Sequence, residues 1–590
     1  MESENEVKSR SNKLPVCAKE YIKQVLRKMR YRREVRQDVQ AELSAHFEDE
    51  LKECASDEEK EQKAERLIAG FGNVKLLAVL LRRAKKRCRP LWQTMVARTF
   101  QTVGVLIVCF VIYVVWFLTG KPVVTVDYIA ELNRIVRPTA DDSQNAAPLY
   151  HKAAKAYEEL PDDIVILLHT RYKQATAEQK PLINKWLADN KEILDLVIAG
   201  TQKPYYWQKY EEGGGVEGMM SIPMPHLTEF RRLAYALRWR AQLHAEQGRY
   251  EEAFDDLKSC YRLGRHLKDG PFLIEQLVGF SIERTATEAL LHIFCEHEID
   301  LVRLTKLQQD FEEMLADEDF TVDFEAEKLF LFDEIQRSFT GSHYLGEGHI
   351  IPKHIYELYP MVQVIESLSA DSQSISPAKK QEPSWVSKFI SDVRYEIYEL
   401  GDLIYEAGSF VKKNCYILFL HPNKQETFQA AQKFYDYWER MKVKTPGQIQ
   451  TEAIDIEEVH KKVIAGNVLL ELLAPALARC VELSHLNECD VKSLIAIIAL
   501  LRYEKRSGHY PDDLQELTSA GYLKELPMDP YSDKPLIYKR TDDNFLLYSV
   551  GPNFTDDGGE SGKDTKGRVR KWRNNGDTVF WPVPKLQLKQ

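Results

Sequence analysis

One long uncharged run interrupts the mixture of polar and apolar positions that fills the rest of the chain. It covers residues 99–120 (TFQTVGVLIVCFVIYVVWFLTG), and thirteen of its 22 residues are Val, Ile, Leu or Phe. A helix needs about 20 mainly apolar residues to cross the hydrocarbon core of a bilayer. Each of those side chains favours insertion by roughly −0.3 to −0.6 kcal/mol, which sums to about −4 to −8 kcal/mol. The run therefore predicts a transmembrane helix over 99–120 rather than a buried core helix.

Upstream of this run, apolar residues recur at the spacing of one helix face. The stripe consists of Val35, Val39, Leu43, Phe47 and Leu51. A second helix is expected to start at a capping box formed by Ser56 and Glu59 and to end at the Gly-Phe-Gly sequence of 70–72. A third helix contains leucines at 76, 77, 80 and 81. We expect a disordered tail over 1–17 and a helical domain over 18–90.

Downstream, residues 121–490 are rich in Leu, Ala, Glu and Lys, which favours a large helical domain. The stretch 241–260 has the pattern of one tetratricopeptide-like helix hairpin. Small residues at 241, 253 and 260 allow two helices to approach closely, Gly248 ends the first helix, and Tyr250 fills the gap. No second copy follows at the repeat's spacing of about 34 residues. The pattern predicts a helical-hairpin domain that binds protein or peptide, with an exposed linker near 367–384.

The last hundred residues combine helix and strand patterns. A helix is expected over 491–508 (VKSLIAIIALLRYEKRSG), and its apolar part is too short to span a membrane. Residues 536–538 and 545–548 are expected to pair as a hairpin, and 578–580 to add a third strand. We therefore expect a small α+β module over 491–590.

Charge sets the predicted orientation of the span. Seven basic residues lie shortly before it, at 82, 83, 85, 86, 87, 89 and 98. The segment after it mixes basic residues at 121, 134 and 137 with acidic residues at 127, 131, 141 and 142. The positive-inside rule places residues 1–98 in the cytoplasm and 121–590 outside the cytoplasmic (inner) membrane. The net charge of −10 gives no reason to expect a nucleic acid partner.

Cysteine and histidine patterns predict little chemistry. The chain has nine cysteines and no CxxC pair, which disfavours a zinc or thioredoxin-like site. Of the five cysteines after the span, Cys480 and Cys489 could pair, although buried thiols are favoured. The group His292, Cys295, His297 and Glu298 lacks a metal-ligand spacing and favours packing. A pocket around His343, His349 and His354 is an alternative to plain loop structure.

Familiar catalytic motifs are absent from the sequence. It contains no GxSxG and no GxxxxGK[ST]. Acid/base pairs leave no linear signature, so catalysis stays open. No catalytic residue is predicted.

Two segments resemble known families. Glu42-Leu43, His46-Phe47, Asp49-Glu50, Ala64, Phe71-Gly72-Asn73 and the leucines of 76–81 make the N-terminal region similar to the HAAS-type or permease prefix domain of bacterial membrane proteins. That resemblance implies a cytoplasmic domain linked to signalling or regulation, without catalytic residues. It covers about 70 residues of a loose motif.

The C-terminal module resembles the globular part of type II secretion major pseudopilins. The matching positions are Tyr510-Pro511, Leu514, Leu517, Tyr522-Leu523, Leu526-Pro527, Asp529-Pro530, Pro535, Tyr538, Tyr548-Ser549, Gly551 and Asp556-Asp557. The resemblance implies a calcium-binding loop, with Asp556, Asp557 and Asp577 as carboxylate ligands. Basic residues over 563–573 would weaken such a site. The family's N-terminal leader and adjoining hydrophobic helix are not found, which argues against assembly into a pseudopilus.

Three functions follow as expectations. The first is a single-pass bacterial membrane protein with an external interaction, sensory or scaffold domain and protein partners. The second is a membrane-tethered enzyme with its site in the helical domain. The third is a component related to type II secretion.

Overall fold

The structure is a computed structural model that describes residues 14–87, 91–157, 172–214, 217–341, 348–355, 358, 420–474, 477–565 and 567–583. The described part of the chain is mainly helical, with 65% of its residues in helices. Its contacts divide it into two units, Met1–Val115 and Trp116–Gln590. The linker expected near 367–384 lies outside the described residues.

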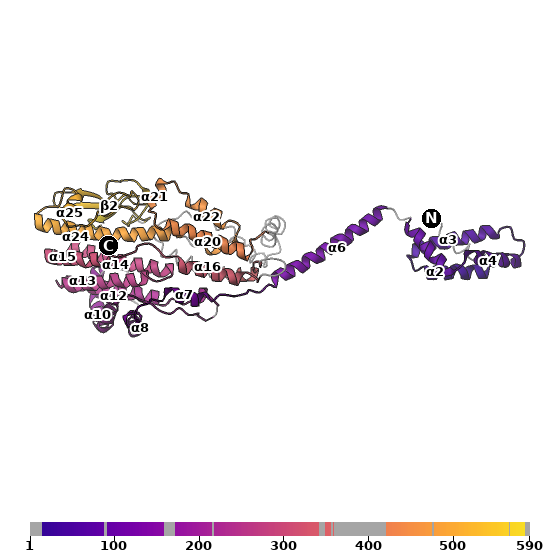
Figure 1. Cartoon of the computed structure of the whole chain (residues 1–590), viewed down its shortest axis with the longest axis horizontal. Helices are drawn as coiled ribbons and strands as arrows, with labels where there is room; N and C mark the ends of the chain where they lie inside the picture. The colour runs from indigo at the N-terminus through magenta and orange to yellow at the C-terminus, as the bar shows by residue number, and fades with distance from the viewer. Residues whose placement is uncertain are drawn as a thin grey trace. The chain divides into compact units, whose positions relative to one another are not determined.

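The first unit contains four helices before the apolar run: α2 (Val16–Met29), α3 (Arg33–Leu51), α4 (Asp57–Phe71) and α5 (Val74–Arg87) (Figure 1). The predicted stripe on α3 is confirmed, because Val39, Leu43, Phe47 and Leu51 are buried. Helix α2 was not among the helices expected from the sequence. It starts within the segment expected to be a disordered tail, and Leu14 just before it is buried in the same core.

The start of α4 shows how its capping residues work. The Ser56 hydroxyl accepts a hydrogen bond from the Glu59 N–H at 3.2 Å. The Glu59 carboxylate accepts from the Ala55 N–H at 3.1 Å, one residue before the position that a standard capping box uses. Both orphan amide groups are satisfied, so the predicted helix start is confirmed with a shifted partner.

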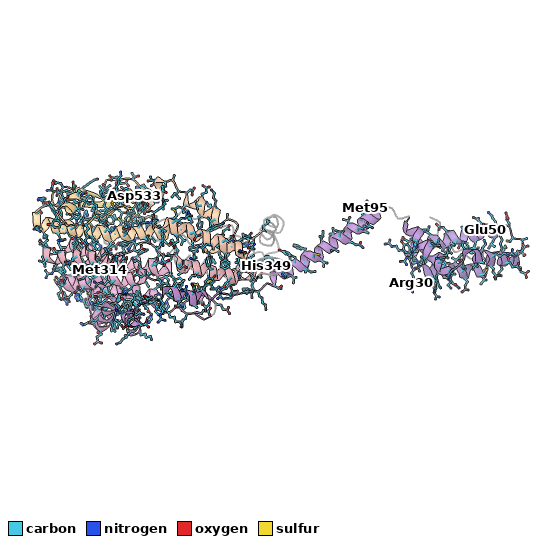
Figure 2. All side chains as sticks on the ribbon, viewed as in Figure 1. Arg30, Glu50, Met95, Met314, His349 and Asp533 are labelled. Atoms are coloured by element: carbon cyan, nitrogen blue, oxygen red, sulfur yellow. The ribbon has the colours of Figure 1, made fainter. Side chains whose placement is uncertain are left out.

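Helix α6 (Leu91–Leu118) contains the apolar run. Its part Met95–Leu118 is long and apolar enough to cross a membrane, and most of its side chains are exposed (Figure 2). The helix ends two residues before the predicted end at Gly120. Exposed apolar side chains along so many turns are costly in water, since each buried apolar Å² is worth about 25 cal/mol. This helix alone is weak evidence for membrane association.

The second unit is built from helices that lie side by side, with a small sheet at one face (Figure 1). The N-terminal part contains α7 (Tyr128–Val136), α8 (Ala147–Ala156), α10 (Gln179–Asp189), α11 (Lys191–Thr201), α12 (His226–Glu246), α13 (Tyr250–Lys268), α14 (Leu273–Glu296), α15 (Leu301–Met314) and α16 (Glu325–Ser338). After the undescribed segment follow α20 (Lys424–Met441), α21 (Pro446–Thr451), α22 (Ile456–Ile464), α23 (Val468–Leu473), α24 (Leu477–Ser507) and α25 (Gln515–Ser519). Short 3-10 turns lie at Asp142–Gln144, Tyr172–Gln174, Met219–Ser221 and Gly551–Asn553.

The predicted hairpin is formed by α12 and α13. Gly248 lies between them with φ +74°, a left-handed conformation that residues with a Cβ adopt rarely. Ala241, Ala253 and Cys260 have no exposed surface, in agreement with their expected place in the helix contact. Helix α14 then packs on α13, and the pair meets through backbone atoms at Gly264 and Gly279.

Helix α24 joins the helices to the sheet. It begins at Leu477, so the expected module boundary between residues 490 and 491 falls inside one continuous helix. A single hydrophobic core includes residues from α11 to α15, from α24 and from the strands: Leu194, Trp239, Leu257, Leu290, Phe311, Ile497 and Phe580. Helix and module thus share one core.

The sheet confirms the predicted strands. Strands β1 (Ile537–Arg540), β2 (Phe545–Ser549) and β3 (Thr578–Trp581) lie in the order β1-β2-β3, all antiparallel. Arg540 pairs with Phe545 across the hairpin turn, and Tyr548 pairs with Val579. A register shift between Leu547 and Tyr548 bends the central strand.

The disulfide that the sequence left open between Cys480 and Cys489 is not formed. Cys480 and Cys489 both lie on α24, nine residues apart. A rise of about 1.5 Å per residue separates them by roughly 13 Å, whereas a disulfide needs Cα atoms within about 7 Å. They therefore do not pair. Cys260 and Cys489 are buried as favoured, but Cys295 is exposed.

A buried carboxyl group between α14 and α24 gives the second unit a pH dependence. Glu283 has no exposed surface, and its Oε2 accepts from Asn487 Nδ2 at 2.5 Å. Burial raises the pKa of Glu283 from 4.5 to about 7, although Lys268 and the Asn487 hydrogen bond oppose the rise. The folded state therefore binds this proton more tightly than the unfolded state.

We expect the second unit to lose stability as the pH rises from about 4.5 to 7, because a raised pKa stabilises the fold only while the group stays protonated. The contribution is roughly 3 kcal/mol, at about 1.4 kcal/mol per pKa unit. In Glu283→Gln, the unfolding midpoint of the full-length protein in detergent should fall less over this range. Glu288→Gln, an exposed position on the same helix, serves as the control. Parallel pH profiles for wild type and Glu283→Gln would contradict the assignment.

Candidate functional site

The last turn of α6 is held by the second unit. We call residues 116–126, together with Gln336, Thr340 and His349, the exit junction. Phe117 is only 2% exposed, whereas the apolar side chains earlier in the helix are mostly exposed. Its ring stacks on His349 with centroids 4.5 Å apart, and the Trp116 ring lies 4.3 Å from the same imidazole. The end of the candidate membrane span is therefore packed into the protein.

His349 also satisfies the end of α6 chemically. Its Nε2 lies 3.1 Å from the Phe117 carbonyl oxygen, one of the carbonyls that a helix C-terminus leaves without an internal partner. A carbonyl only accepts, so Nε2–H donates and Nδ1 is left as an acceptor. Thr340 Oγ1 lies 3.3 Å from Nδ1 and accepts from the His349 N–H at 3.0 Å. The imidazole thus connects the helix end to Thr340.

The backbone around His349 permits this close approach. Gly348 has φ +87°, and a Cβ there would overlap the Thr340 carbonyl oxygen. A Cβ at Gly120 would overlap the Thr340 side chain. Thr340 N–H also donates to the His349 carbonyl at 2.9 Å, and Thr340 bridges to Pro122. Gly348 in particular is needed for the junction to close, because its neighbour is backbone and its φ is left-handed.

A cavity opens at the junction. It has a volume of about 330 Å³ and is lined by Trp116, Thr119, Gly120, Lys121, Val123, Thr340, Gly341 and His349. The sequence left a pocket around His343, His349 and His354 open as an alternative to plain loop structure. The cavity contains His349, while His354 instead lies 3.3 Å from the buried Glu334 carboxylate, and His343 lies outside the described residues.

Helix α16 holds the chain that leaves the junction. Gln336 Oε1 accepts from the N–H groups of Thr125 and Val126 at 3.1 and 3.2 Å, and its Nε2 donates to the Val126 carbonyl at 2.7 Å. The amide therefore pairs with the backbone as a neighbouring strand would. Gln336 Nε2 also donates to Asp333 at 2.8 Å.

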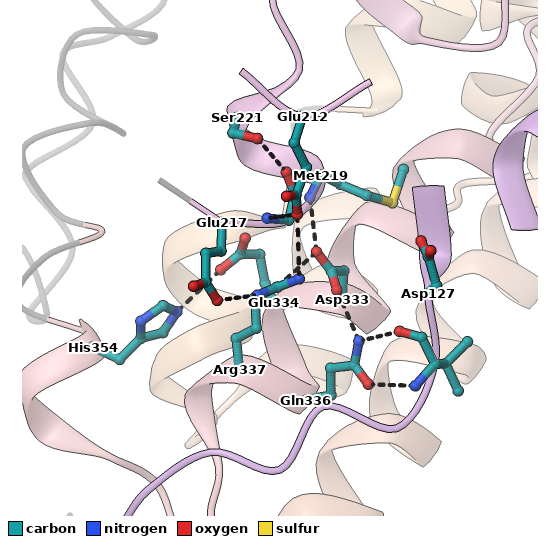
Figure 3. A network of polar contacts seen from close by, with 12 residues as sticks. Asp127, Glu212, Glu217, Met219, Ser221, Asp333, Glu334, Gln336, Arg337 and His354 are labelled. Carbon is teal, nitrogen blue, oxygen red and sulfur yellow. Dashed lines mark hydrogen bonds and ion pairs between the residues drawn. The ribbon is translucent and has the colours of Figure 1, made fainter. Parts of the chain in front are cut away.

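Asp333 extends this network to a second segment. It is 1% exposed, accepts from the Met219 N–H at 2.8 Å, and accepts from Arg337 Nε at 3.0 Å (Figure 3). Arg337 in turn lies 3.4 Å from Glu217. One turn of α16 thus ties the exit segment to residues 217–221. Asp333 and Gln336 were not found from the sequence, because the contacts that tie them to other segments are with backbone groups more than a hundred residues away.

A separate buried network surrounds the start of α14. Glu275 has no exposed surface. Its carboxylate accepts from Tyr210 Oη at 2.8 Å and from the Phe272 N–H at 3.2 Å, and it lies 2.8 Å from His226 Nε2. Gln208 Nε2 lies 2.9 Å from His226 Nδ1. The network links three separate segments of the second unit, and its polar atoms are occupied by one another, as expected for a structural core.

The predicted calcium ligands lie in one loop but are engaged differently. Asp577 Oδ1 and Oδ2 accept from the N–H groups of Asp557 and Gly559 at 3.2 and 2.6 Å. Asp556 Oδ1 accepts from Tyr548 Oη at 2.8 Å. Burial raises the pKa of Asp577, whereas the Gly558 N–H lowers the pKa of Asp556. The carboxylates are held by protein donors.

The calcium site stays a prediction. Within the described parts of the chain, no group of three or more His, Cys, Asp or Glu side chains is placed to hold a metal ion. Asp556, Asp557 and Asp577 are among these residues, and so is His292, which lines a void of only about 20 Å³. The basic residues expected to oppose calcium are partly neutralised, since Arg568 pairs with Asp564 at 2.8 Å.

Calcium remains a hypothesis that the family resemblance supplies, and it predicts a specific result. Calcium should raise the melting temperature of the wild-type protein relative to chelator, and Asp556→Ala/Asp557→Ala should abolish that rise. Asp542→Ala/Asp543→Ala, in the exposed hairpin turn, is the matched control. Equal responses of wild type and the first variant in a thermal melt would remove the calcium hypothesis.

Comparison with known proteins adds no family. No family model, curated protein or solved structure matches this chain. The function is therefore inferred from the geometry of the chain itself.

Proposed function

We propose that this chain is a single-pass membrane protein whose second unit binds a protein or peptide outside the cytoplasmic membrane. Binding of that partner would be signalled to the transmembrane helix α6. The exit junction carries the proposal. Its contacts fix the last turn of α6 to the second unit through His349 and Thr340. Trp116 and Phe117, near the end of α6, belong to the second unit by their contacts.

The helical arrangement supports a binding role for the second unit. We interpret α12 and α13 as a tetratricopeptide-like hairpin, in which small residues at 241, 253 and 260 are fully buried. Helices of this kind present side chains to a partner while their backbone stays fixed. The N-terminal unit, similar to HAAS-type domains at the residues quoted above, would receive the signal in the cytoplasm.

Neither alternative gains a specific observation from the described residues. The secretion-related role rests on the resemblance of the C-terminal module alone. An enzyme would need convergent groups in an open pocket, and the Glu275 network is buried instead.

Topology can be tested in the bacterial host with epitopes at both ends of the full-length protein. We expect it to stay in the membrane pellet after an alkaline wash. External protease on spheroplasts should remove the C-terminal epitope and leave an N-terminal fragment of about 120 residues, because the span ends near Gly120. Full-length protein in the high-speed supernatant would overturn the proposal.

Partner binding is tested by affinity purification from detergent-solubilised membranes with mass spectrometry. The matched control is the chain truncated after residue 120, which retains the first unit and the span. Proteins retained by the full chain and lost from the control would be partners of the second unit. Identical sets from both would contradict the binding role.

A further inference from the structure

Helix α5 exposes an apolar stripe on the first unit. Leu76, Val79 and Leu80 are 61%, 47% and 52% exposed. Together with Arg83 they follow the i, i+3, i+4, i+7 spacing of one helix face. Another face of the helix faces the core of the unit, since Ala78 is buried and α5 packs against α2.

The charge beside the stripe has one sign. The sequence of α5, VKLLAVLLRRAKKR, contains no acidic residue. Lys75 and Arg83 are exposed and lie four residues before and after Val79. An amphipathic helix with apolar residues between cations binds an anionic lipid surface, because the apolar groups enter the acyl boundary while the cations stay among the phosphates.

The covalent chain keeps α5 near the membrane. Only residues 88–90 separate its last residue, Arg87, from Leu91, the first residue of α6. A segment of this length spans at most about 14 Å when fully extended. If α6 crosses a bilayer, the C-terminal end of α5 therefore stays close to the cytoplasmic headgroups.

We propose that the exposed stripe of α5 is a lipid-binding surface that seats the first unit on the anionic inner face of the membrane. Leu76, Val79 and Leu80 enter the acyl boundary, and Lys75 and Arg83 lie beside lipid phosphates. This proposal rests on the proposed membrane insertion of α6. A second copy of the chain on the stripe is the competing occupant.

The test uses the full-length protein in lipid nanodiscs, with a photoreactive benzoylphenylalanine in place of Val79. After irradiation, we expect lipid adducts by mass spectrometry in discs that contain phosphatidylglycerol. Their yield should fall at least about fivefold in pure phosphatidylcholine and in a Lys75→Glu/Arg83→Glu background, since each basic residue near an anionic surface contributes about 1 kcal/mol. The same probe at Glu58, an exposed position on α4, is the control.

The outcomes separate this inference from the membrane assignment. A protein that incorporates into discs but gives no lipid adducts at Val79, or equal adducts at Val79 and Glu58, overturns the lipid surface alone. Chain-to-chain adducts at Val79 would make the stripe an interface between copies and overturn it as well. A protein that never incorporates into discs overturns the proposed function first.

Discussion

Replacing Glu275 by alanine should lower the free energy of unfolding of the second unit by about 3 to 5 kcal/mol, the cost of removing one partner from a buried polar group. Tyr210 Oη and the Phe272 N–H would lose their acceptor, and His226 would lose its carboxylate. Each unsatisfied buried donor costs about 1 to 3 kcal/mol. Glu275 is fully buried, so water cannot replace these hydrogen bonds in the variant.

The measurement is denaturant unfolding of the full-length protein in detergent, followed by tryptophan fluorescence. Glu275→Gln keeps an oxygen that accepts from Tyr210, so its free energy of unfolding should fall clearly less than that of Glu275→Ala. Glu288→Ala, an exposed position on the same helix, should leave the midpoint unchanged. If Glu275→Ala unfolds at the wild-type midpoint, the network does not hold α14 to its neighbours.

Replacing Gly279 by valine should destabilise the second unit by about 3 kcal/mol or more, at the upper end of the range for overpacked cores. A Cβ at Gly279 would lie 2.5 Å from the Lys268 backbone nitrogen and 2.6 Å from the Gly264 carbonyl oxygen. These are backbone atoms of α13, which cannot rotate away. The two helices would have to separate at their closest contact.

The same unfolding experiment checks this result, and Gly279→Ala should show a smaller loss in the same direction. Gly214→Ala is the control, because a Cβ there meets nothing within 4 Å. A Gly279→Val protein as stable as the wild type would show that α13 and α14 do not meet through their backbones.

Local patterns were enough wherever neighbours in sequence decide the structure. The period of apolar residues on α3, the start of α4 at Ser56, and the break at Gly248 are set by bonds and dihedral angles within a few residues. The hairpin of β1 and β2 follows for the same reason, since its partners are separated by one short turn. The apolar run needed only its length and composition.

Contacts between distant segments could not be predicted from local sequence patterns. Gln336 bonds to the backbone of Val126, which any residue type would offer, so no pattern marks the pair. The Glu275 network joins residues 49 and 65 positions apart. The sequence left open a disulfide between Cys480 and Cys489 across a loop, but both residues lie on the continuous helix α24.

The sequence by itself determined a mainly helical chain, one apolar helix fit to cross a membrane, and a short antiparallel sheet near the end, because these depend on periodicity and propensity over short windows. Only the tertiary structure decided that His349 closes the end of α6, that α5 leaves a cationic apolar stripe exposed, and that helices and sheet share one core. The physical reason is that burial and hydrogen-bond partnership depend on which surfaces meet in space, and chain order does not encode that directly.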